Sequence, residues 1–297
     1  TGFLFLRFAH GFSAGFTPTG TSAYVADTVP FAKRGEALGI QSLFGSLGMA
    51  AGPALGGWIA SIWPINVLFY AAAFTAIFSI LILVRLKETL TTKEPLRLGL
   101  FKLDKNEILE KRVLLPSTIL FLSVFSFGVV LTLIPDLSSF IGIKNKGLFF
   151  AVFTLSSLGI RLIAGRASDR IGRVKVMRLA SAVMVLAMIA VAFATSKFML
   201  LGSAVLFGAA VGMYSPTTTA WVVDRSLDKF RGRALATMYI FLELGIGLGA
   251  LVSSWLYNNK AENFQLAFLF SAGVAFLGFL LLIFIKSDRK LEPLSVT

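Results

Sequence analysis

The sequence contains no cysteine and only one histidine, His10. Disulfides, iron–sulfur clusters and zinc sites built on thiolates are therefore excluded. No HExxH motif is present, and only one carboxylate lies deep inside an apolar stretch, so an embedded hydrolase would lack paired acids or a nucleophile with its base. We expect no cofactor, no metal and no enzymatic activity.

Charge is also scarce, because Asp, Glu, Lys and Arg make up 14% of the 297 residues whereas hydrophobic residues make up 56%. Ordinary soluble domains contain about 25% charged residues. The apolar residues form runs of about 20 or more, the length that an α-helix needs to cross a bilayer core of about 30 Å. We predict an all-α membrane protein with nine spans, at residues 2–27, 36–60, 65–85, 113–136, 147–167, 177–195, 198–224, 232–256 and 264–286.

The net charge of +13 would suggest nucleic-acid binding in a soluble protein, but the positions of the basic residues argue against it here. If residues 28–35 are cytoplasmic and the spans alternate in direction, 22 of the 28 Lys and Arg fall in cytoplasmic segments and four on the opposite side. This asymmetry follows the positive-inside rule. The basic residues therefore orient the chain in the lipid bilayer, with a cytoplasmic C-terminus, and contact anionic headgroups rather than nucleic acid.

One long polar segment separates the predicted spans into two groups. We expect residues 1–86 to be the remainder of an N-terminal bundle and residues 87–112 a cytoplasmic linker. A C-terminal six-helix bundle then covers residues 113–286, and a cytoplasmic tail covers residues 287–297.

Residues 11–58 repeat without a gap at residues 208–255. The identical residues shape the backbone or carry charge, and include Gly11 and Gly208, Asp27 and Asp224, Arg34 and Arg231, Gly48 and Gly245, and Trp58 and Trp255. A parallel repeat of membrane bundles is typical of transporters whose halves expose a midplane site to each side in turn. Three spans precede the repeated region in the second group, so we expect about three helices before Thr1 in the complete protein.

The first of three motifs reads Gly165-Arg-Ala-Ser-Asp169-Arg170-Ile-Gly172-Arg173 and lies between two predicted spans. Glycines permit a tight turn, a carboxylate is stabilised at a helix N-terminus, and guanidinium groups bind acidic partners. We predict that Asp169 faces the helix start near residues 35–37 and that Arg170 or Arg173 pairs with Asp224.

The second motif, Arg7-Phe-Ala-His10-Gly-Phe-Ser-Ala-Gly15, lies in the first span. An arginine inside a span is costly unless it lines a polar cavity, so Arg7 is a functional candidate and His10 a weaker one, with interfacial or packing roles as alternatives.

The third motif, over residues 48–57, places small residues every fourth position around Pro53. Such spacing permits close helix packing, and proline removes a backbone donor.

Glu243 is the one carboxylate well inside an apolar span, about 15 Å from Arg233 along the helix. Its charged form is disfavoured at that depth, so Glu243 is a candidate for proton coupling or substrate contact, with a hydrogen bond to a neighbouring helix as the structural alternative. Arg161 lies nearer the cytoplasmic end of its span, where we expect it to snorkel or to latch a gate.

With these motifs the sequence resembles the major facilitator superfamily, over what corresponds to helices four to twelve of a twelve-helix member. The resemblance implies two pseudo-symmetric halves and a monomeric secondary active transporter for a small-molecule substrate. Because the third motif resembles that of drug–proton antiporters, efflux coupled to protons is the first expectation, and proton-coupled nutrient or metabolite symport is the alternative. A bacterial cytoplasmic membrane is the expected location.

The resemblance also assigns the candidate residues to groups. A cytoplasmic gate loop comprises Gly165, Asp169, Arg170, Gly172, Arg173, Asp224, Asp27, Arg34 and Arg231. The antiporter-type packing motif comprises Gly48, Gly52, Pro53, Gly56 and Gly57. Cavity-lining candidates, for which aromatic packing is the alternative, are Tyr24, Gln41, Tyr214 and Tyr239.

Overall fold

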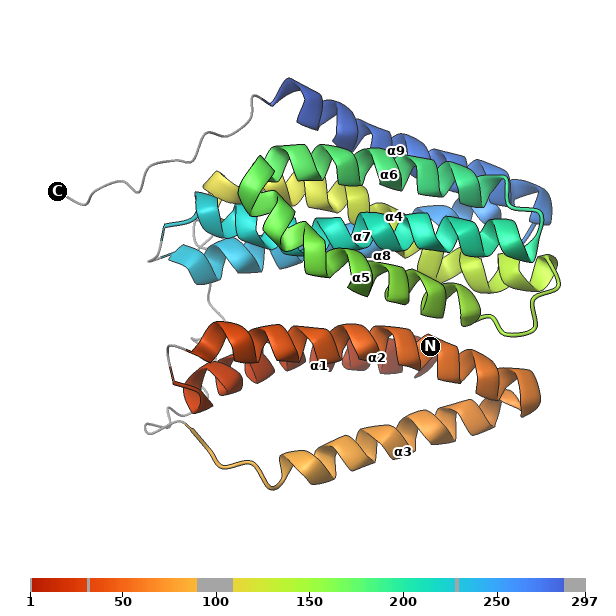
Figure 1. Cartoon of the computed structure of the whole chain (residues 1–297). Helices are drawn as coiled ribbons and strands as arrows, with labels where there is room; N and C mark the ends of the chain where they lie inside the picture. Colours follow the sequence, from red (N-terminus) through yellow and green to blue (C-terminus); the bar gives the residue numbers. More distant parts are fainter. Residues whose placement is uncertain (1, 31–32, 90–108, 228–229, 286–297) are drawn as a thin grey trace. The chain divides into compact units, whose positions relative to one another are not determined.

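The structure, a computed structural model, describes residues 2–30, 33–89, 109–227 and 230–285, with some side chains of the first two helices left out. All regular elements in these ranges are helical (Figure 1). The α-helices are α1 (Gly2–Thr28), α2 (Arg34–Ile62), α3 (Ile65–Leu83), α4 (Leu114–Phe140), α5 (Leu148–Ile171), α6 (Arg173–Ala192), α7 (Lys197–Arg225), α8 (Arg231–Tyr257) and α9 (Phe264–Phe284). Two short 3-10 helices, η3 (Lys111–Val113) and η5 (Ala261–Asn263), precede α4 and α9.

Each predicted span coincides with one of these helices. Within the described ranges, α3 to α9 are long and apolar enough to cross a membrane. The helices α1 and α2 have 27 and 29 residues. The predicted bounds are wrong at one junction, where α5 continues to Ile171 and α6 begins at Arg173, leaving Gly172 as the whole connection.

The helix ends follow the internal repeat. Arg34 and Arg231, which are equivalent in the repeat, begin α2 and α8. Thr28 and Arg225, also equivalent, end α1 and α7. Equivalent sequence therefore produces equivalent helices in the two groups.

The chain divides into two compact units, residues 1–49 with 65–97 and residues 50–64 with 98–297. The predicted linker lies mostly outside the described residues, and the predicted tail lies wholly outside them. The second half of α2 groups with the later unit because it lies against the turn before α5. A Cβ added at Gly57 would lie 2.5 Å from the backbone nitrogen of Gly147.

Within the second unit, α4 packs on α8 and α9, α7 packs on α5 and α6, and α6 packs on α9 (Figure 1). Glycines allow the closest of these approaches. A Cβ at Gly128 of α4 would overlap the carbonyl oxygen of Ile246, and one at Gly249 of α8 would overlap that of Phe125. Small residues at such contacts let helix backbones approach closely where lipid provides no hydrophobic drive for association.

Aromatic side chains fill the core of the second unit. The ring of Phe207 stacks on that of Phe127 at 6.0 Å and meets Phe153 edge-on at 5.5 Å, joining α7 to α4 and α5. Tyr214 and Ser181 bond hydroxyl to hydroxyl between α7 and α6, and Ser126 and Ser271 do so between α4 and α9 at 2.9 Å. Apolar and polar contacts of the core thus join α4, α5, α6, α7 and α9.

Candidate functional site

The first motif forms a helix end rather than a loop. Residues 165–171 continue α5, and Gly172 ends it with φ +100° and ψ 146°, a conformation that L-residues with a side chain rarely adopt. Gly165 is helical, and a Cβ there would meet no heavy atom within 4 Å. Of the two glycines expected to shape a turn, only Gly172 does so.

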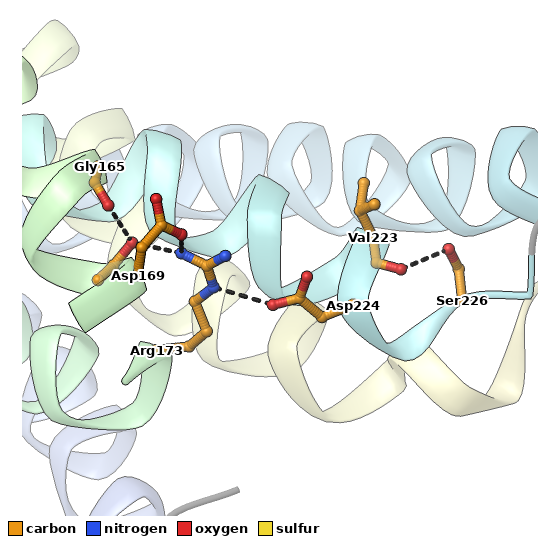
Figure 2. Close-up of polar contacts among 7 residues, drawn as sticks. Gly165, Asp169, Arg173, Val223, Asp224 and Ser226 are labelled. Atoms are coloured by element: carbon orange, nitrogen blue, oxygen red, sulfur yellow. Dashed lines mark hydrogen bonds and ion pairs between the residues drawn. The ribbon is translucent and has the colours of Figure 1, made fainter. Parts of the chain in front are cut away.

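Arg173, the first residue of α6, lies at the centre of an ion-pair cluster (Figure 2). Its Nε donates to a carboxylate oxygen of Asp224 on α7 at 2.9 Å, and its Nη1 reaches the carboxylate of Asp169 and the hydroxyl of Ser168 on α5. The Arg173 side chain is only 19% exposed, whereas those of Asp169 and Asp224 are 65% and 52% exposed. One guanidinium therefore ties the ends of α5, α6 and α7 together.

The predicted pairing of Arg173 with Asp224 is confirmed, whereas Arg170 is exposed and takes no part in the contacts shown for the cluster. The predicted contact of Asp169 with residues 35–37 stays a prediction, and the side chain of Arg34 lies outside the described ones. Asp27, the repeat equivalent of Asp224, accepts a hydrogen bond from Thr89 at 3.3 Å. Arg231 is exposed at the start of α8.

The end of the linker contacts this same end of the second unit, which the sequence did not indicate. The backbone N–H of Glu110 donates to the Thr237 hydroxyl of α8 at 2.9 Å. The Nε of Arg225 on α7 donates to the carbonyl of Arg112 at 3.2 Å. Residues 110–112 therefore bridge the ends of α7 and α8.

Glu243 lies on the exposed side of α8, twelve residues after the helix begins, or about 18 Å along its axis. Tyr239, one turn earlier on that side, is 52% exposed. The opposite side of α8 carries Gly245 and Gly249, which pack against α4. Tyr239 and Glu243 are therefore available at the surface of the second unit, and their roles stay predictions.

Arg161 lies farther from the end of its helix than the sequence suggested. Because α5 extends to Ile171, Arg161 is ten residues, or about 15 Å, from the end of its helix. The side chain is half-buried, and its Nη2 donates to the Ser215 hydroxyl of α7 at 3.0 Å. The helix continues through the motif that was expected to be a loop, and the location of Arg161 near the cytoplasmic end of its span stays a prediction.

Tyr214 is also misassigned as a cavity-lining residue. It is 3% exposed and lies in the core between α6 and α7, where its hydroxyl bonds to Ser181. Tyr24 and Gln41 are half-buried in the first unit. The Gln41 amide donates to Thr21 at 2.8 Å and so joins α2 to α1.

Arg7 and His10 are both exposed on α1, and their functional roles stay predictions. The residues from Gly11 to Gly15 also fit the GxSxG pattern of α/β-hydrolases. However, α1 is a continuous helix there, and the Ser13 hydroxyl donates to the His10 carbonyl at 2.9 Å. The strand-to-helix elbow that exposes a hydrolase nucleophile is therefore absent from this described helix.

The packing motif lies in α2, which continues through Pro53. Gly57 makes the close approach expected of a small residue, since it lies against Gly147. Gly52 belongs to the same unit, but a Cβ added there would meet no heavy atom of that unit within 4 Å. Gly56 is half-buried, and the structure gives no close neighbour for Gly48. Of Gly48, Gly52 and Gly57, for which the structure gives the surroundings of an added Cβ, Gly57 shows the expected close packing.

Comparisons with known proteins agree with this architecture. The family model described as Major Facilitator Superfamily matches the chain twice, at residues 1–160 and 117–296. A protein named multidrug resistance protein MdtG, from Klebsiella pneumoniae, is 29% identical over 287 residues, which cover 92% of this chain and 67% of that protein. The MdtG protein of Escherichia coli K12 is 28% identical, over 92% of this chain and 68% of its own length.

A protein named multi-drug resistance efflux pump PmrA, from Streptococcus pneumoniae, is 29% identical over 267 residues, covering 84% of this chain and 64% of that protein. The chain thus spans about two thirds of the length of the curated relatives it matches.

Proposed function

The chain belongs to the Major Facilitator Superfamily, and from this membership we propose that the complete protein exports small organic molecules in exchange for protons. The family consists of membrane transporters rather than enzymes, and the chain is a multi-pass integral membrane protein. Relatives named for multidrug resistance and efflux support export as the direction of transport. Their bacterial origin supports a cytoplasmic membrane location. We further propose that the protein is a monomer with a cytoplasmic C-terminus.

The observation that carries the proposal is the exposed carboxylate of Glu243 in the apolar helix α8. An ionised carboxylate at bilayer depth is expensive unless it faces a polar space, and a protonated one is not. We propose Glu243 as the residue that carries the exchanged proton in the state whose surroundings are closed to water. A group that carries a proton in this way couples proton movement to the transition between the two states that are open to opposite sides of the membrane.

Alternating access follows from the repeat in this proposal. Two related bundles rock about the substrate, so the cytoplasmic helix ends separate in one state and close in the other. The Arg173 cluster supports rigid-body movement of the second bundle, because one guanidinium joins α5, α6 and α7 at their ends. We propose that Asp27, Arg34 and Arg231 belong to the same cytoplasmic gate.

Proton flux in liposomes containing the complete protein tests the proposal. Vesicles loaded with a pH-sensitive dye receive ethidium outside, and the internal pH is recorded as ethidium enters. Antiport predicts that protons leave as ethidium enters, so the internal pH rises. Protons entering together with ethidium would instead establish symport, the alternative mechanism.

The variant Glu243→Gln identifies the coupling residue. Gln resembles the protonated acid, so we expect ethidium exchange between the two sides to persist while proton-driven accumulation is lost. Glu262→Gln is the matched control, because Glu262 lies 74% exposed in the turn before α9, outside the apolar spans. If the Glu243→Gln variant transports with proton coupling at the wild-type level, Glu243 is not part of the coupling mechanism.

A further inference from the structure

Arg161 lies in a position of α5 that otherwise packs against other helices. The buried residues of α5 recur every three or four positions, and Arg161 continues this stripe between Ser157 and Ala164. It is the one charged residue in that stripe between Phe149 and Ser168. Arg161 lies five residues, about 7–8 Å along the axis, before the next charged residue of α5, Arg166, and a charged group on the packed side of a span marks a functional position by default.

The guanidinium of Arg161 is held in place from α7. Its Nη2 donates to the Ser215 hydroxyl at 3.0 Å. One turn earlier, Gly212 of α7 approaches α5 so closely that a Cβ there would lie 2.6 Å from the Ser157 carbonyl oxygen. The cation is therefore positioned before any ligand arrives, which reduces the ordering that binding requires.

The polar surface continues from Arg161 across α7 to α8. Thr219 is exposed one turn after Ser215, donates to the Ser215 carbonyl at 3.0 Å, and lies 4.0 Å from the Met238 sulfur of α8. Tyr239 follows Met238 and is 52% exposed. The contacts thus connect Arg161 of α5 through Ser215 and Thr219 of α7 to the buried Met238 of α8, next to the exposed Tyr239.

We propose that Arg161, Ser215 and Thr219 form a subsite that binds an anionic oxygen group of the transported molecule, such as a carboxylate or sulfonate. A planar guanidinium donates two parallel hydrogen bonds to an oxyanion. The Ser215 hydroxyl accepts from Arg161 and keeps its own hydrogen to donate beside it, whereas the Thr219 hydroxyl donates to the anion only after it turns away from the Ser215 carbonyl. The subsite rests on the proposed function, because it assigns a substrate class to that transporter. Arg161 then distinguishes anionic from cationic substrates.

Equilibrium dye binding to the complete detergent-solubilised protein tests the subsite without requiring transport. Fluorescence anisotropy is recorded with fluorescein, an anion, and with ethidium, a cation. We expect Arg161→Gln to weaken fluorescein binding about tenfold, the effect of losing one charge-assisted hydrogen bond, and to change ethidium binding less than about twofold. Ser215→Ala is expected to weaken fluorescein binding by a smaller factor, because it releases the guanidinium without removing it.

Further variants separate recognition from folding. Arg161→Lys keeps the charge without the planar fork, and we expect it to restore part of the fluorescein affinity. Leu162→Gln adds the same amide at a 75% exposed neighbour, and Lys175→Gln removes a cation from α6; both are expected to bind both dyes like the wild type.

Three results would overturn the subsite: a wild-type protein that does not bind fluorescein, an Arg161→Gln variant that binds both dyes equally weakly, or one that binds both unchanged. Wild-type protein that binds fluorescein but exports neither dye from vesicles would instead contradict the proposed function and leave the subsite standing.

Discussion

In the second unit, the Nε of Arg173 on α6 donates to the carboxylate of Asp224 on α7 at 2.9 Å. Asp224 is the next-to-last residue of α7, the first helix of the second copy of the internal repeat, and Arg173 is the last residue of the Gly165–Arg173 motif. Two segments that are 51 residues apart therefore meet at one helix end. The contact couples the short α5–α6 hairpin to α7, the helix against which both members of the hairpin pack.

We expect the Arg173–Asp224 pair to contribute about 1 kcal/mol or less to stability, because the Asp224 side chain is half-exposed to water. A double-mutant cycle with Arg173→Gln and Asp224→Asn, measured by thermal unfolding in detergent, gives this coupling energy. The coupling should fall as salt is added. The more exposed Lys260–Glu262 pair, at 3.9 Å, is the control and should show no coupling. A coupling no larger than that of the control would show that the Arg173–Asp224 pair does not stabilise the fold.

The two glycines of the first motif should respond oppositely to alanine. Gly172→Ala forces a side chain into φ +100° and should destabilise the protein by about 1–3 kcal/mol. Gly165→Ala lies within α5 with no heavy atom near the new Cβ, so it should be neutral or stabilise by up to about 1 kcal/mol. Thermal unfolding midpoints compare the two variants directly. Equal destabilisation by both would mean that Gly165 also shapes a turn.

Arg178 caps the end of α9 from α6, donating from Nε to the Leu282 carbonyl at 2.8 Å and from Nη2 to that of Ile285 at 2.6 Å. These carbonyls belong to the last turn, where helical partners are missing. Arg178→Met keeps the apolar stem but removes the donors, and should destabilise the protein by about 2 kcal/mol. Lys175→Met, on the exposed side of α6, should stay within about 0.5 kcal/mol of wild type. Similar losses for both variants would argue against the cap.

Tyr214→Phe tests the burial of Tyr214 in the bundle core. Loss of the hydroxyl that bonds to Ser181 should destabilise the protein by about 0.6 kcal/mol, the average for such bonds between membrane helices, and leave dye export unchanged. Tyr239→Phe is the matched change on the exposed side of α8, and should alter dye export without altering the unfolding midpoint. Altered dye selectivity in Tyr214→Phe would indicate that Tyr214 lines the substrate cavity.

The helices and their repeat were largely determined by the sequence itself. Long apolar runs fix where spans lie, because a backbone in hydrocarbon must satisfy its own hydrogen bonds within a helix. The repeat places α2 and α8 at equivalent residues, Arg34 and Arg231. The Arg173–Asp224 pair was also predictable, because scarce charges at the ends of neighbouring spans have few possible partners.

Tertiary structure alone decided which side of each helix is buried. Hydropathy indicates how apolar a helix is, but a helix that is apolar all round carries no stripe that identifies its packed side. The sequence therefore could not tell that Tyr214 lies in the core while Tyr239 is exposed. It also could not place Arg161 beside Ser215, because that contact joins residues 54 positions apart and depends on the close approach of α5 and α7 at Gly212.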